Sequence, residues 1–437
     1  MVVTMSSRAR ALSVRRLLPA VLVTLGLVVT AVGLPAGPAS AATTTRFSPT
    51  PVSIDQTNGP VWDLEVAGGR IYAAGAFTST RPAGSAAGTG ESNQARLAAF
   101  DASSGTRVAS FAPTLTNDWN NQPGTVYATA LSPDKRTLYV GGDFNLVNGQ
   151  RAEHLARFDT ATGEFLGQVG WNGVNGTVRS LAVSPDGTKL YVGGAFSVAN
   201  WSTRDRLAAF DLTTNAVTDW APVVSVPVAR EALRVESLAV SSDGAKVFVG
   251  GPFQRMNGRA AQGIAAVNAT TGASASGFRS DYFLAPSGWA TTIEVAGGSV
   301  YFAGRDDGGS SSRREGVHAV NTSTGTRAWY ASCYGDTFDL AVVDQEVYVA
   351  SHAHDCSRAG GLGETNPTRY IALHVLDRST GRVKPDFAVQ TSGVTSRPDS
   401  LLLSRALASD GNQLVMGGGW DNVGSTPQAN LTRFRLR

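Results

Sequence analysis

The chain is poor in cysteine, in charged residues and in recognisable catalytic signatures. Two of its 437 residues are cysteines, and Asp, Glu, Lys and Arg together make up 16% of it. The HExxH, GxSxG and GxxxxGK motifs and the EF-hand loop are all missing. After residue 34, no stretch approaches the roughly 20 apolar residues that a membrane span needs. These absences remove the common signatures of zinc peptidases, serine hydrolases and phosphate-binding enzymes, and they argue against a membrane span.

Residues 1–41 have the composition of an export signal rather than of folded structure. Four arginines between residues 8 and 16 precede an apolar run over residues 17–34, and small residues occupy positions 39–41. We expect cleavage after Ala41, which leaves a mature chain of residues 42–437 that is secreted and extracellular.

Removing this leader changes the charge balance. The leader carries four arginines and no acidic residue, so the formal net charge falls from +3 for the whole chain to −1 for the mature part. The basic character therefore belongs to the leader, and the sequence gives no support for nucleic-acid binding.

Internal repeats indicate the architecture. The clearest unit spans residues 178–220 and contains four strand-length segments separated by turn residues, the first turn being Ser184–Gly187. A second-strand pattern recurs as IYAAGAF at 71, LYVGGDF at 138, LYVGGAF at 190 and VFVGGPF at 247. Its paired small residues should let neighbouring layers approach closely. A third-strand pattern such as RLAAFD leads into an Asx turn that ends in glycine, as in residues 159–163.

Seven such units predict an all-β fold, a seven-bladed β-propeller of four-stranded antiparallel blades. The expected first strands begin near Val61, Val126, Val178, Val235, Ala290, Thr337 and Leu402. The last unit stops after its third strand, whereas residues 45–50 resemble the fourth strand at 111–114 without a blade of their own. We infer that the N-terminal strand completes the last blade and closes the ring.

These units resemble the bacterial delta-sixty-type propeller repeat, within the YVTN and quinoprotein-like propellers. The second unit carries the resemblance best, with Gly141-Gly142-Asp143-Phe144, the Asn148-Gly149 turn, Arg151 and the LARF segment at 155–158. The resemblance covers nearly all of the mature chain but concerns framework residues. It implies a propeller fold and a secreted setting, and it supplies no catalytic residue.

Cys333 and Cys356 are expected to form a disulfide, because a pair in an oxidising compartment is usually bonded. The bond would close a segment of 22 intervening residues and stabilise by about 3 kcal/mol on loop-closure grounds. The long loop that contains Cys356 also contains His352, His354 and Asp355. These three are candidate ligands for a divalent metal, Ca or Zn. The alternative is that they are only polar neighbours of a loop pinned by the disulfide.

The second residue of each first strand should lie at the mouth of the central channel, where loops of one face meet. This series reads Trp62, Tyr127, Arg179, Glu236, Thr291, Phe338 and Leu403. The next position reads Asp63, Ala128, Ser180, Ser237, Thr292, Asp339 and Ser404. Of these we take Trp62, Asp63, Tyr127, Arg179, Glu236 and Asp339 as candidate ligand-binding residues. Ordinary packing between blades is the competing interpretation, especially for Phe338 and Leu403.

We therefore expect a monomeric binding scaffold that recognises an extracellular glycan, peptide or surface protein through its loop-rich face. The alternative is a propeller enzyme, either a quinone-dependent dehydrogenase or a polysaccharide hydrolase or lyase, with a metal-assisted site at the channel mouth. Convergent carboxylates and a bound cation would favour that alternative. The sequence assigns no catalytic residue.

Overall fold

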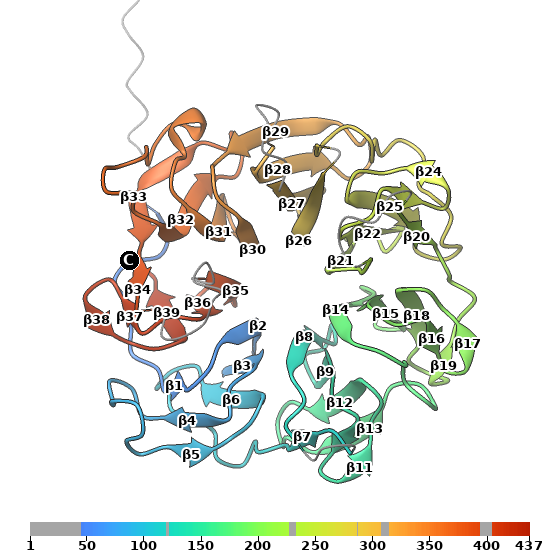
Figure 1. The fold of residues 1–437 in the computed structure, drawn as a ribbon, viewed down its shortest axis with the longest axis horizontal. Helices are drawn as coiled ribbons and strands as arrows, with labels where there is room; N and C mark the ends of the chain where they lie inside the picture. The colour runs from blue at the N-terminus through green and yellow to red at the C-terminus, as the bar shows by residue number, and fades with distance from the viewer. Residues whose placement is uncertain (1–44, 119–121, 227–232, 286, 307–313, 394–403) are drawn as a thin grey trace, which may run out of the picture. The chain divides into compact units, whose positions relative to one another are not determined.

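The computed structural model describes residues 45–437, apart from 119–121, 227–232, 286, 307–313 and 394–403. Within these residues the regular elements are β-strands and a single 3-10 turn, η1 (Ser357–Ala359), and the strands form antiparallel sheets that follow one another along the chain (Figure 1). The same residues contain no helix with the length and apolar composition needed to cross a membrane. The predicted export signal, residues 1–41, lies outside the described residues.

The larger sheets repeat one arrangement, in which each strand pairs with the next along the chain and short hairpins interrupt the path. Their strands are β2 (Val61–Ala67), β3 (Arg70–Gly75) and β6 (Leu97–Asp101); β8 (Val126–Leu131), β9 (Thr137–Gly142), β12 (Leu155–Asp159) and β13 (Phe165–Gln168); β14 (Val178–Val183), β15 (Lys189–Gly194), β18 (Leu207–Asp211) and β19 (Ala216–Val217); β21 (Ser237–Val240), β22 (Lys246–Gly250) and β25 (Ile264–Asn268); β26 (Gly288–Ala296), β27 (Ser299–Asp306), β28 (Gly316–Asn321) and β29 (Arg327–Ser332); β30 (Thr337–Val343), β31 (Glu346–Ala353), β32 (Ile371–Asp377) and β33 (Val383–Val389); and β35 (Ser404–Ser409), β36 (Gln413–Gly418) and β39 (Leu431–Arg435).

Smaller sheets join the connections between these strands. They are β1 (Gln56–Thr57), β4 (Ser79–Arg81) and β5 (Ser92–Asn93); β7 (Leu115–Thr116), β10 (Leu146–Val147) and β11 (Gln150–Arg151); β16 (Val198–Ala199) and β17 (Ser202–Thr203); β20 (Val224–Ser225), β23 (Arg255–Met256) and β24 (Arg259–Ala260); and β34 (Thr391–Ser392), β37 (Asn422–Val423) and β38 (Thr426–Pro427). In four of these sheets, the segment that leads into a first strand pairs with the hairpin between the second and third strands. The two kinds of loop therefore lie together.

Local turn chemistry explains why the strands end where they do. The Asn148-Gly149 pair has φ values of 50° and 75°, the left-handed pair that a two-residue hairpin turn requires. In the turn after β12, Asp159 Oδ1 accepts hydrogen bonds from the Ala161 and Thr162 amides at 2.9 and 2.7 Å. Gly163 then takes a φ of 78°. The Asx turns predicted from the third-strand pattern are present.

Glycines of the second strands allow one sheet to pack closely on the next. A Cβ on Gly193 of β15 would lie 2.6 Å from Val235 Cγ1 and 3.2 Å from Leu238 Cδ1. Both side chains are buried and belong to the start of the following sheet. The hydrophobic core is accordingly divided among clusters that lie between neighbouring sheets, such as the one that joins Tyr191 and Trp220 to Phe253.

The first strands of the larger sheets contact one another in sequence. Contacts join β2 to β8, β8 to β14, β14 to β21, β21 to β26, β26 to β30, β30 to β35, and β35 to β2. The second strand of the same sheet, β36, also packs on β2, since a Cβ on Gly417 would lie 2.6 Å from Val61 Cγ1. Strands from both ends of the described chain are therefore direct neighbours.

The first described residues pair with the last strand. Antiparallel bridges join Phe47 to Leu436 and Val52 to Arg433. Arg433 is 2% exposed, and its Nε donates to the Ser53 carbonyl at 3.0 Å while its Nη1 donates to the Ala102 carbonyl at 2.6 Å. Residues 45–57 thus lie along β39 and beside the first sheet, where the sequence predicted an N-terminal strand.

Three first strands start two residues away from the predicted position, namely β21 at Ser237 instead of Val235, β26 at Gly288 instead of Ala290, and β35. In the last of the larger sheets, the first strand is β35, which starts at Ser404 within the described residues. The predicted start of this strand, Leu402, lies outside the described residues. The irregular register between Ser404 and Ala406 matches the one between Val61 and Asp63. The counterpart of Trp62 is therefore Arg405, and the predicted Leu403 is replaced in that series by Arg405.

Candidate ligand-binding site

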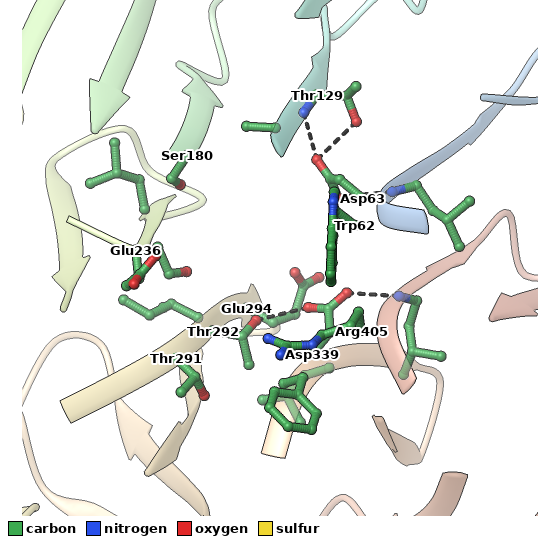
Figure 2. Close-up of a pocket in the computed structure, with 18 of the residues that line it drawn as sticks. Trp62, Asp63, Thr129, Ser180, Glu236, Thr291, Thr292, Glu294, Asp339 and Arg405 are labelled. Atoms are coloured by element: carbon green, nitrogen blue, oxygen red, sulfur yellow. Dashed lines mark hydrogen bonds between the residues drawn. The ribbon is translucent and has the colours of Figure 1, made fainter. Parts of the chain in front are cut away.

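A cavity of about 620 Å³ is lined by residues of all the first strands named above. Six of these strands carry a bulge at their start, and each bulge displaces one residue from the ladder. Bulges re-aim side chains, and the displaced residues line the cavity. We call the following set the mouth residues: Trp62, Tyr127, Arg179, Glu236, Thr291, Phe338 and Arg405. The predicted candidates Trp62, Tyr127, Arg179 and Glu236 all line this cavity, and Figure 2 shows Trp62 and Glu236 among its walls.

Guanidinium groups lie over aromatic rings at the mouth. The Arg179 guanidinium carbon is 4.8 Å from the Tyr127 ring centre. Arg405 is 4.2 Å from the ring of Phe338 and 5.4 Å from that of Trp62. Each such contact holds the charge over a π face and supports its orientation. Phe338, for which plain packing was the favoured interpretation, is one of these rings.

Two further arginines, together with carboxylates, complete the described part of the mouth. Arg179 lies 3.7 Å from Glu236, whose carboxylate also accepts a short hydrogen bond from Arg234. Arg305 is stacked 5.1 Å from the Trp289 ring and lies 3.5 Å from Asp336. Arg234, Trp289 and Arg305 were not predicted from the sequence, because Arg234 precedes β21, Trp289 lies two residues before the expected position in β26, and Arg305 belongs to the second strand β27.

Below the mouth, Asp63 and Asp339 tie neighbouring first strands together. Asp63 Oδ2 accepts hydrogen bonds from the Thr129 amide at 2.5 Å and the Thr129 hydroxyl at 2.9 Å. Asp339 accepts from the Thr292 hydroxyl at 2.8 Å and from the Leu407 amide at 2.7 Å (Figure 2). Burial raises the pKa of Asp63 to about 6 and that of Asp339 to about 7, although these hydrogen bonds oppose the rise. Both candidates line the cavity, but their carboxylates are already hydrogen-bonded to neighbouring first strands.

Two glutamates lie one step further along the same strands. Glu65 of β2 and Glu294 of β26 line the cavity, and the register of the bulged strands puts alanines such as Ala130 and Ala341 at matching positions. Burial raises the pKa of each glutamate to about 8, with a smaller contribution from neighbouring carboxylates. Neither glutamate was among the sequence candidates, because those were taken from the second and third positions of each first strand. The alternation of the strand, continued by two residues, would have found them.

The structure does not gather His352, His354 and Asp355 into one set of ligands. His352 Nε2 lies 3.4 Å from the Asp336 amide, His354 Nδ1 lies 3.5 Å from Glu364 Oε1, and Asp355 Oδ1 accepts from the Ser357 amide at 2.9 Å. Each side chain has its own local partner. Among the described residues, the group whose donor atoms lie close enough for a shared ion is a different one, Cys333, Cys356 and His374.

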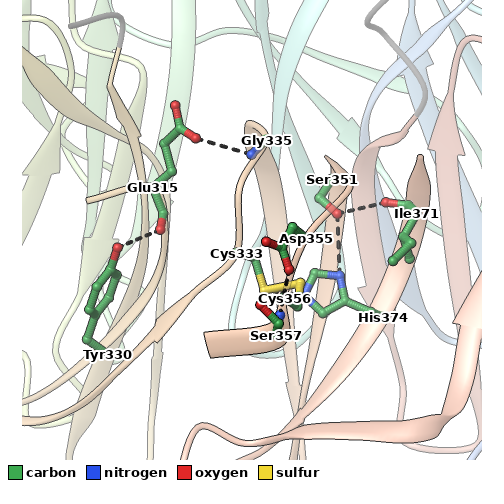
Figure 3. The surroundings of a disulfide bond; sticks show 10 residues. All are labelled: Glu315, Tyr330, Cys333, Gly335, Ser351, Asp355, Cys356, Ser357, Ile371 and His374. Carbon is green, nitrogen blue, oxygen red and sulfur yellow. Dashed lines mark hydrogen bonds between the residues drawn. A yellow bond between two sulfur atoms is a disulfide. The ribbon is translucent and has the colours of Figure 1, made fainter. Parts of the chain in front are cut away.

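The predicted disulfide is present and joins Cys333, the residue after β29, to the segment that follows β31. Cys333 and Cys356 are both buried, with their Cα atoms 4.2 Å apart. His374 of β32 lies against the bond, with Nε2 3.8 Å from Cys333 Sγ (Figure 3). Burial lowers the pKa of His374 to about 4, so its imidazole is neutral.

Comparisons with known proteins support the same architecture. A family model described as the Rax2 C-terminal beta propeller domain matches residues 97–229. A chain in the crystal structure of a mitotic checkpoint complex superposes with a TM-score of 0.54 at 15% identity, over 88% of this chain and 94% of that chain. The fold is that of a β-propeller. None of the curated proteins matches the chain.

A second solved structure, hydrazine synthase of Kuenenia stuttgartiensis, gives a TM-score of 0.43 at 14% identity, over 67% of this chain and 73% of that chain. The family model and the mitotic checkpoint complex chain support a β-propeller family, but they do not test the finer resemblance to the delta-sixty-type repeat. At these identities the solved structures inform the fold alone.

Proposed function

We propose that this β-propeller is an exported binding scaffold with seven blades of the delta-sixty type, closed by its N-terminal strand. The cycle of contacts among the first strands and the bridges from Phe47 and Val52 to β39 support the blade count and the closure. The buried disulfide suits an oxidising compartment. Export is tested by N-terminal sequencing of the protein recovered from culture medium, where Ala42 is the expected first residue and retention in the cytoplasm would contradict the proposal.

The ligand site is the mouth of the cavity, and the ligand is an extracellular glycan, peptide or surface protein. The observation that carries this proposal is the set of mouth residues, in which aromatic rings and guanidinium groups converge on a cavity of about 620 Å³. A concave site with aromatic walls and a few placed polar groups is the usual form of a ligand pocket. The Trp62 Nε1 proton also lacks an acceptor among the described residues, so this hydrogen-bond donor is available to a ligand.

Binding is tested with glycan and peptide arrays on the purified chain and its Trp62→Ala and Arg405→Ala variants. Truncating a central aromatic or arginine of a binding site typically costs at least about 2 kcal/mol, or roughly 30-fold in affinity. Trp201→Ala is the matched control, because Trp201 is 69% exposed and does not line the cavity. If the Trp62 and Arg405 variants bind as well as wild type, the mouth is not the binding site.

The enzyme alternative has less support from the described residues. Its carboxylates at Asp63 and Asp339 hold backbone amides of neighbouring strands, and its expected metal ligands do not converge. Turnover of array ligands by wild type, lost in a Glu65→Gln or Glu294→Gln variant, would favour this alternative over a binding scaffold.

A further inference from the structure

The disulfide and His374 form a buried group of three donors that the proposed binding function does not use. Cys333 Sγ, Cys356 Sγ and one ring nitrogen of His374 all lie within 4.8 Å of one another. The three residues are at most 2% exposed. They come from three separate places in the chain, namely the end of β29, the loop after β31, and β32. The fold, rather than local sequence, brings them together.

A hydrogen bond determines how the imidazole is oriented. Ser351 Oγ donates its one proton to the Ile371 carbonyl at 2.9 Å, so toward the His374 Nδ1 atom, 3.4 Å away, it can act only as an acceptor (Figure 3). The proton of the neutral ring therefore lies on Nδ1. Nε2 keeps its lone pair and faces Cys333 Sγ at 3.8 Å. A histidine whose far nitrogen is held by a second residue while the near nitrogen faces a ligand position is typical of metal sites.

We propose that Cys333, Cys356 and His374 form a binding site for a thiophilic divalent cation such as Zn²⁺ when the disulfide is reduced. A dithiol reductant breaks the S–S bond, becomes a disulfide itself and leaves two cysteine thiols. The cation then binds two thiolate sulfurs and His374 Nε2, and the two thiol protons pass to solvent. Oxidation by a second disulfide reverses the sequence and releases the ion.

The chemistry of this donor set fits a thiophilic cation. Two thiolates and an imidazole, with water in the fourth position, are an established set of ligands for Zn²⁺. Two thiolate charges also cancel the two positive charges of the ion, so the buried site would hold no net charge. A cation that prefers oxygen ligands, such as Ca²⁺, would find none of its preferred donors among these three residues.

Access to the site runs through the loop that carries Cys356. Residues 363–370 of this loop are exposed, and Cys356 itself precedes the short turn η1. Opening of this loop would break the bridge between Tyr334 and Asp355 and expose the sulfur atoms, while the strand β32 that holds His374 could stay in place. Reduction and metal binding are therefore expected to be slow compared with metal binding at an open surface.

The test uses Co²⁺ as a spectroscopic probe on the purified chain, oxidised and after reduction. We expect the reduced protein to bind one equivalent, with thiolate-to-cobalt charge-transfer absorption and the visible bands of tetrahedral cobalt, and the oxidised protein to bind none. Zn²⁺ should displace Co²⁺ and protect both thiols from alkylation. Ser351→Ala should weaken binding by roughly 10- to 100-fold, as loss of a residue that orients a ligand does, and His374→Ala should weaken it further.

The controls are His352→Ala and His354→Ala, which remove the two histidines of the same region that the structure places elsewhere. These variants should leave cobalt binding by the reduced protein unchanged. Failure of the reduced wild type to bind cobalt, or equal binding by a folded Ser351→Ala or His374→Ala variant, would overturn the proposal. Binding by the oxidised protein that depends on His352 and His354 would also overturn it, because the site would then be the one first expected from the sequence.

Discussion

Replacing Phe47 with alanine tests whether the N-terminal segment is part of the fold. The Phe47 ring is fully buried, 5.3 Å from the Tyr348 ring, in a cluster that includes Phe387 and Phe434. Around it, the Ser48 amide donates to the Arg435 carbonyl at 2.9 Å. Truncating a buried phenylalanine to alanine costs about 3–5 kcal/mol through lost burial and the cavity that remains. We expect a loss of that size in the free energy of unfolding.

The assay is equilibrium unfolding in denaturant, followed by tryptophan fluorescence and circular dichroism. Thr50→Ala is the control, because Thr50 belongs to the same segment but is exposed, and such changes usually stay within about 0.5 kcal/mol. Limited proteolysis gives a second measurement, since a loosened segment should be cut before the strands are. If Phe47→Ala and Thr50→Ala have equal, small effects, the segment is not a structural strand and the proposed closure fails.

Three further predictions follow from the packing and the charges. The pKa values of Glu65 and Glu294 are raised from 4.5 to about 8 in the folded state. Between pH 4.5 and pH 8 unfolding therefore releases protons, and the free energy of unfolding should fall as the pH rises. Changing both glutamates to glutamine should remove most of this pH dependence, measured by unfolding curves at pH 5 and pH 8. Gly193→Ala should cost about 1–3 kcal/mol by overpacking, because its Cβ would meet Val235, whereas Ala substitution at Gly149, with nothing within 4 Å, should add only the strain of its positive φ. Reducing the disulfide should lower the free energy of unfolding by about 3 kcal/mol, and a reduced protein as stable as the oxidised one would contradict this.

Turn chemistry and repetition made the strand pattern predictable from sequence. The Asn148-Gly149 turn and the Asx turn at Asp159 require particular residues for backbone reasons that do not depend on the rest of the fold. The disulfide was predictable because two cysteines have only one possible internal pairing, and such a pair is usually bonded if the chain is exported as expected. The start of β35 was not predictable from the sequence, because moving the start of a strand by two residues leaves each side chain on the same face of the sheet. Leu403 and Arg405 therefore fit the alternation equally well, and only the bulge distinguishes them.

The candidate site was predictable only in part. Trp62, Tyr127, Arg179 and Glu236 occupy the same place in successive repeats, so their convergence followed from the repeat itself. The group around the disulfide depends instead on the register between β31 and β32, which shifts between Ala350 and Ala353. That shift determines where His374 lies relative to Ser351. Sequence reasoning instead selected His352 and His354, which are close to Cys356 along the chain but have partners of their own.

The pairing of Ser53 with Arg433 across 380 residues affects the order of events during folding. Val52 and Ser53 meet their partner, Arg433, only once the last strand, β39, is in place, whereas Asp55 and Gln56 beside them pair with Gly105 and Arg81 near the start of the chain. The entropy lost in closing a loop grows only slowly with its length. The free-energy cost of pairing residues 380 positions apart therefore stays moderate. Contacts formed late slow unfolding rather than speed folding. We expect the pairing of the N-terminal segment with β39 to determine the unfolding rate of the protein, not its folding rate.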